Sequence, residues 1–131
     1  MAGVIVLDAS VLIAYLDGAD NHHPAAEALL ADVAGEEFGI NILTLAEVLV
    51  GPARTGRLAQ TRSALLDLQV QELPFPVDAA SGLAALRAET GLKMPDCCVL
   101  LAAERAGATL ASFDDRLART ATVRGVEVLT P

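Results

Sequence analysis

Short β-like runs alternate along the chain with longer segments in which apolar residues recur every three or four positions. Five runs predict β-strands, at residues 4–7, 38–43, 70–73, 109–112 and 126–129. Seven segments predict helices, at residues 10–16, 44–51, 57–68, 78–90, 95–106 and 115–120 and within 23–35. This alternation predicts an α/β sandwich around a mostly parallel central sheet, formed by residues 1–131 as one domain.

An isolated carboxylate interrupts the first long apolar stretch. Residues 5–16 read IVLDASVLIAYL, and Asp8 stands where the first predicted strand ends. Ser10 is available as the cap of the helix that follows. A buried carboxylate is costly unless a donor or a cation satisfies it. Asp8 therefore either caps the turn or holds a cation, and its position alone does not distinguish the two.

Three further acids occupy equivalent places. Glu47 is expected in the first turn of the helix after strand two, Asp96 in the first turn of a later helix, and Asp114 just after the fourth strand. The carboxyl ends of parallel strands meet at one edge of a sheet, so these acids and Asp8 are expected to converge. Clustered carboxylates repel one another unless they gain a proton or a cation. Oxygen ligands suit Mg²⁺ or Mn²⁺, which can activate water to cleave a phosphodiester.

Each acid also has a purely structural interpretation. Asp8 can cap a turn, and residues 44–47 (TLAE) fit the capping box, in which a Glu side chain returns to the helix start. Asp96 in a first turn favours the helix dipole without any metal. Asp114 or Asp115 can cap the last helix. Capping and metal binding are compatible, so the metal hypothesis depends on all four acids together.

Composition narrows the classes of function. Nine Lys and Arg against seventeen Asp and Glu give a net charge of −8, which argues against nucleic-acid binding across the whole surface. Any action on RNA needs bound cations and a local basic patch. Residues that either supply such a patch or lie on solvated helix faces are Arg54, Arg57, Arg62, Lys93, Arg116 and Arg119. The adjacent Cys97 and Cys98 form no disulfide framework, and we recognise neither a signal peptide nor a membrane span, so a cytoplasmic protein is expected.

Four segments, taken in order, resemble a known family. They read VLDASVLIAYL, TLAEVLVG, KMPDCCVLLAAERAGATLASFDDRL and GVEVL, and they span residues 4–129. They are similar to the PIN domain and, more narrowly, to the VapC-type toxin ribonucleases of bacterial toxin–antitoxin pairs. The resemblance implies a PIN-like α/β/α sandwich and Mg²⁺- or Mn²⁺-dependent endoribonuclease activity on RNA. It also implies a homodimer and a cognate antitoxin protein that forms a hetero-oligomer with the toxin.

The same resemblance assigns the site residues. The catalytic and metal-binding acids are Asp8, Glu47, Asp96 and Asp114. Ser10 matches a small polar residue that often follows the first acid, and Ser112 matches the hydroxyl before the last. Asp115 can share or replace the role of Asp114, because the family varies at the next position.

Other interpretations remain. A catalytically silent PIN-like module that acts only through its antitoxin is the main alternative. A signalling receiver domain is disfavoured, because residues 7–10 (LDAS) supply one acid where two are needed and Lys93, the only lysine, is followed by a helix. The adjacent His22 and His23 hint at a second metal site, although their spacing suits no common zinc motif.

Overall fold

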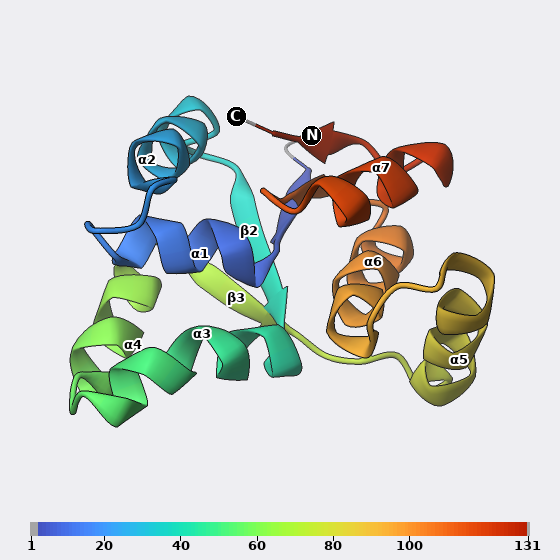
Figure 1. Ribbon diagram of the computed structural model, residues 1–131, viewed down its shortest axis with the longest axis horizontal. Coiled ribbons are helices and arrows are strands. Elements are labelled where there is room, and N and C mark those ends of the chain that lie inside the picture. Colours follow the sequence, from blue (N-terminus) through green and yellow to red (C-terminus); the bar gives the residue numbers. More distant parts are fainter. Residues whose placement is uncertain (1–2, 131) are drawn as a thin grey trace.

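A parallel β-sheet runs through the middle of the structure, a computed structural model that describes residues 3–130 (Figure 1). Its strands are β1 (Val4–Leu7), β2 (Glu37–Asn41), β3 (Val70–Leu73), β4 (Thr109–Ala111) and β5 (Val128–Leu129). They lie in the order β3-β2-β1-β4-β5, and every neighbouring pair is parallel. The predicted α/β class with a mostly parallel central sheet is confirmed.

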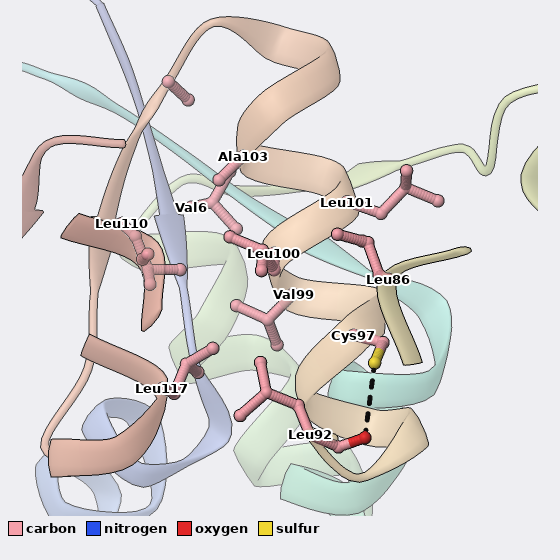
Figure 2. Close-up of a cluster of buried hydrophobic side chains, with 12 residues drawn as sticks. Val6, Leu86, Leu92, Cys97, Val99, Leu100, Leu101, Ala103, Leu110 and Leu117 are labelled. Carbon is pink, nitrogen blue, oxygen red and sulfur yellow. Dashed lines mark hydrogen bonds between the residues drawn. The ribbon is translucent and has the colours of Figure 1, made fainter. Parts of the chain in front are cut away.

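Helices connect the strands and cover both faces of the sheet. Within residues 3–130 they are α1 (Ala9–Leu16), α2 (His23–Asp32), α3 (Ile42–Arg54), α4 (Leu58–Asp67), α5 (Ala79–Thr90), α6 (Met94–Ala106) and α7 (Asp115–Val123). Successive residues of a strand point to opposite faces. Ile5 and Leu7 therefore pack with α1 to α4, and Val6 packs with α5 to α7. Figure 2 shows the second of these cores, in which Val6 meets Val99 and Leu110.

The sheet extends from the central strand β1 on both sides. The chain first builds β2 and β3 on one side and then returns to place β4 and β5 on the other side. The helices after β1 and β4 lie on opposite faces of the sheet, so their first turns diverge. In sheets of this kind ligands bind in the crevice outside the carboxyl ends of such strands. Asp8 follows β1 and Asp114 follows β4 at this point.

The predicted boundary between strand two and its helix is wrong. The strand ends at Asn41, and α3 begins at Ile42 and continues past Pro52 to Arg54. The Asn41 side chain accepts a hydrogen bond from the Thr44 N–H at 2.9 Å and donates one to the Thr44 hydroxyl at 2.8 Å. Asn41 is therefore the helix cap, and the capping box expected at residues 44–47 does not form.

Other helix and strand ends differ by a few residues. Asp8, not Ser10, caps α1. Asp78 holds the cap position of α5 but makes no capping hydrogen bond, because its carboxylate pairs with Arg105 at 2.7 and 2.8 Å. The last helix continues to Val123, and the last strand is correspondingly short.

The two cysteines lie inside the molecule. Cys97 and Cys98 are buried and free, and burial raises the pKa of both thiols. The Cys97 thiol donates to the Leu92 carbonyl at 3.5 Å, as Figure 2 shows. None of the helices between residues 3 and 130 has the length and apolar character needed to cross a membrane.

Candidate active site

Asp8 is buried at the carboxyl end of β1, where only 7% of its surface is exposed. Its Oδ1 accepts a hydrogen bond from the Ala9 N–H at 2.9 Å. Its Oδ2 accepts from the hydroxyls of Ser10 and Ser112, both at 2.8 Å. These donors replace the water that burial removed, so the site holds a carboxylate in a fixed orientation.

The two serines extend this network to the loop before α7. The Ser10 hydroxyl accepts from the Phe113 N–H at 3.1 Å, and the Ser112 hydroxyl accepts from the Asp114 N–H at 2.9 Å. Each hydroxyl therefore donates to Asp8 and accepts from the backbone beside the fourth acid. The network joins the start of α1 to the start of α7, although these segments are about a hundred residues apart in the sequence.

Asp114 caps α7, since its Oδ1 accepts from the Leu117 N–H at 3.0 Å. Its side chain remains exposed and faces the other acids closely enough to raise the pKa of Asp96. Asp115 lies one position further, inside the first turn of α7. No effect of Asp115 on Asp96 is resolved among the described residues, which favours Asp114 as the acid of this cluster.

Asp96 lies half-buried in the first turn of α6, as predicted. Burial raises its pKa to about 6, and repulsion from Asp114, Asp8 and Glu47 adds to this increase. Lys93, at the cap position of α6, opposes the increase with its positive charge. The charges of all three other acids therefore act on Asp96, so the four predicted acids lie in one region of the structure.

Glu47 lies in the second turn of α3, one turn further from the helix start than predicted. Its side chain is exposed as a whole, yet partial burial of the carboxyl raises its pKa, and the charge of Asp8 raises it further. Figure 1 shows that the neighbouring parallel strands β1 and β2 run to the same edge of the sheet, where α1 and α3 begin, which brings the segments that carry Asp8 and Glu47 to the same edge.

The cluster fits a divalent cation held by few protein ligands. Within residues 3–130 no three His, Cys, Asp or Glu side chains lie close enough together to hold a metal ion as they stand. Mg²⁺ is often bound by one or two carboxylates while waters fill its other positions. Neighbouring acids that raise one another's pKa also gain from a nearby positive charge. An open set of carboxylates around Asp8 is therefore compatible with Mg²⁺ or Mn²⁺.

A groove of about 640 Å³ lies beside the acids, between α1, α3 and α4. Its walls include Ile13, Leu16 and Val48, and Glu47 and Arg57 line it as well. The groove joins an apolar surface to one of the four acids. Sequence periodicity does not reveal it, because it depends on how α4 packs against α3.

The two histidines are not paired as metal ligands. The ring of His22 stacks on that of Phe113, with centroids 5.1 Å apart and an angle of 25° between the planes. Nδ1 of His23 contacts the Ala14 carbonyl at 2.8 Å, and Nε2 lies 3.2 Å from Glu27. The suggestion of a second metal site at residues 22 and 23 gains no support from this arrangement.

The chain is similar to known PIN-domain proteins in sequence and in fold. The sequence model of the PIN domain matches residues 5–123. The search of curated proteins found no match.

Among solved structures, a toxin–antitoxin complex from Klebsiella pneumoniae is 25% identical over 84% of this chain and 86% of that chain, with a TM-score of 0.69. The VapC20 toxin of Mycobacterium tuberculosis, which cleaves the sarcin–ricin loop, is 16% identical over 97% and 99%, with a TM-score of 0.77. FitAcB from Neisseria gonorrhoeae is 22% identical over 95% and 96%, with a TM-score of 0.73. The family resemblance expected from the sequence is confirmed, and the chain belongs to the PIN domain family.

Proposed function

We propose that the chain is a divalent-metal-dependent endoribonuclease and the toxin of a toxin–antitoxin pair. The observation that carries this proposal is the placement of four acids at one edge of the sheet, where burial raises the pKa of Asp96 to about 6 and the charges of the other three acids add to the increase. Membership of the PIN domain family supports a nuclease. The similar proteins include an RNA-cleaving toxin and a toxin–antitoxin complex, which supports the biological role.

In the proposed mechanism Asp8, Asp96 and Asp114 would hold Mg²⁺ or Mn²⁺. The ion would supply Lewis acidity for hydrolysis of a phosphodiester. Asp8 keeps its orientation because two serine hydroxyls and a backbone N–H fix both of its oxygens. Asp96 releases its proton more readily once a cation balances the neighbouring acids. We assign Glu47 the positioning of the attacking water, since its carboxyl is exposed.

We further propose an antitoxin as the protein partner. The groove between α1, α3 and α4 combines apolar walls with Glu47, so it suits a segment that carries apolar side chains and a cation. An arginine in that segment can pair with carboxylates through two parallel hydrogen bonds. A homodimer is also proposed, because Ile42, Leu43 and Val50 of α3 are large, apolar and exposed.

Cleavage of RNA by the purified chain tests the enzymatic part of the proposal. We expect cutting with Mn²⁺ or Mg²⁺, no cutting with EDTA, and loss of cutting in Asp96→Asn. Asp32→Asn is the matched control, because Asp32 is an exposed acid at the far end of α2. Cleavage that persists in Asp96→Asn or in EDTA would contradict the mechanism.

One observation favours a second candidate, a silent module that acts only by binding its partner. No three of the acids in residues 3–130 lie close enough together to hold a metal ion as they stand, and an arginine of a partner can balance their charge as a metal does. Antitoxin binding that needs the four acids, together with no cutting of total cellular RNA under any metal, would favour this module.

A further inference from the structure

Two arginines donate hydrogen bonds to the backbone segment that leads into α6. Arg87, near the end of α5, donates through Nη1 to the carbonyls of Gly91 at 2.9 Å and Leu92 at 2.6 Å. Arg116, on α7, donates through Nη2 to the Gly91 carbonyl at 3.2 Å. The Gly91 carbonyl therefore receives donors from two different helices.

Arg116 makes a contact beside the proposed site. It lies two residues after Asp114, the cap of α7, and its partner carbonyl precedes the first turn of α6, which carries Asp96. This hydrogen bond links the start of α7 to the segment just before α6, whereas the other end of α7 is joined to α6 by the pair of Arg124 with Glu104 at 2.9 Å. Arg87 contributes no such link, because its bonds remain between α5 and the segment that follows it.

The link joins two segments that carry like charges. Asp96 lies in the first turn of α6 and Asp114 at the cap of α7, so the hydrogen bond holds together the helix starts that carry these two carboxylates. A hydrogen bond from a charged donor is stronger than one between neutral groups. Gly91 permits the contact: its φ is +70°, and a Cβ there would lie 3.3 Å from Nη2 of Arg116.

We propose that Arg116 is a positioning residue that tethers α7 to the Gly91 carbonyl and so fixes the spacing of Asp96 and Asp114 before metal and RNA bind. The proposal rests on the nuclease function proposed above. Preorganised charge is worth more than charge that must be assembled during the reaction. Loss of the tether leaves the first turns of α6 and α7 freer to shift relative to one another while the core still holds the helices, which weakens the cation site without removing a ligand.

The variant Arg116→Ala removes the tether, and Arg116→Lys keeps a cationic donor that can reach a carbonyl. Val123→Ala is the control, because Val123 lies on the same helix and its side chain is exposed and apolar. For Arg116→Ala we expect about tenfold weaker Mn²⁺ binding by calorimetry and about tenfold lower kcat, with the KM for RNA unchanged. Arg116→Lys should recover part of both losses, and Val123→Ala should match the wild type.

Two results would overturn the positioning role. Mn²⁺ affinity and kcat equal to the wild type in Arg116→Ala would show that the tether does not matter. A raised KM alone, with both other values unchanged, would show that Arg116 contacts RNA phosphates instead.

A metal-free measurement separates this proposal from the proposed function. The Cys97 N–H donates to the Lys93 carbonyl at 3.0 Å in the first turn of α6, and its hydrogen exchange reports opening of that turn. Arg116→Ala should exchange this amide faster than the control Val123→Ala does. If the wild type neither binds Mn²⁺ nor cuts RNA, the proposed function fails, while faster exchange still supports the tether and equal exchange overturns it.

Discussion

A buried carboxylate needs donors in place of the water that it has lost, and Asp8 obtains them from residues on both sides of the sheet's switch point. Ser10 is its neighbour in sequence, whereas Ser112 reaches it from the end of β4 and has no exposed surface. Because each hydroxyl also accepts a backbone N–H, the Asp8 network fixes the loop that carries Asp114. Asp8 and Asp114 are helix caps, and this role is compatible with the metal binding that we propose for them.

The adjacent residues Asp114 and Asp115 allow a test of which of the two is the fourth acid of the proposed site. Asp114→Asn keeps a good helix cap, because Asn and Asp are nearly equal at that position. We expect its melting temperature to match the wild type and its Mn²⁺-dependent cleavage to fall about a hundredfold or more. Asp115→Asn, the adjacent control, should cut RNA normally. Equal loss in both variants would mean that the two acids share the role.

At the scale of elements, the sequence predicts type and order better than ends. The strands at residues 4–7 and 70–73 occur as predicted, since turn or helix signals flank both. The start of α3 was missed because residues 40–43 (INIL) fit a continuous strand, and only the side-chain contacts of Asn41 break the run. For the same reason the sequence named Glu47 but misplaced it by one turn. The bond from Arg116 to the Gly91 carbonyl has no sequence signal, because any residue supplies a carbonyl.

The cap of α3 can be tested directly. Asn41→Ala removes the bond to the Thr44 N–H and leaves that buried threonine without its partner. We expect the free energy of unfolding to fall by about 1–2 kcal/mol in urea denaturation. Asn21→Ala, in the exposed turn before α2, is the control and should be neutral. A neutral Asn41→Ala would mean that packing alone sets where α3 begins.

Across the whole molecule, the cores on the two faces of the sheet hold in place a cluster of charges that repel one another. The helices α1 and α3 are anchored in one core, and α6 and α7 in the other, so the four acids cannot separate without disturbing buried apolar contacts. Lys93 offsets part of this repulsion at Asp96, and the chain as a whole has a net charge of −8. The fold therefore carries a cost at the site that a cation or a cationic partner can offset.

Because repulsion among the acids destabilises the fold, we expect Asp96→Asn, which should abolish cleavage, to raise the free energy of unfolding. The pKa of Asp96 is raised from 3.8 to about 6, so the folded chain keeps a proton that the unfolded chain loses, and wild-type stability falls as pH rises through this interval. Asp96→Asn does not lose stability in this way, because an Asn side chain has no proton to release in this pH interval. Because one pKa unit corresponds to about 1.4 kcal/mol and water partly screens the half-buried carboxyl, we expect the variant in EDTA to be about 1–2 kcal/mol more stable at neutral pH.

Urea denaturation in EDTA at about pH 4 and about pH 7 measures this difference, which should shrink at the lower pH as Asp96 becomes protonated. Adding Mn²⁺ should reverse the order, because a ligand that binds only the folded chain stabilises it, and the wild type has the fuller set of acids. Equal stabilities in EDTA at neutral pH would mean that the four acids do not strain the fold. An advantage of Asp96→Asn that persists in saturating Mn²⁺ would mean that no cation relieves their repulsion.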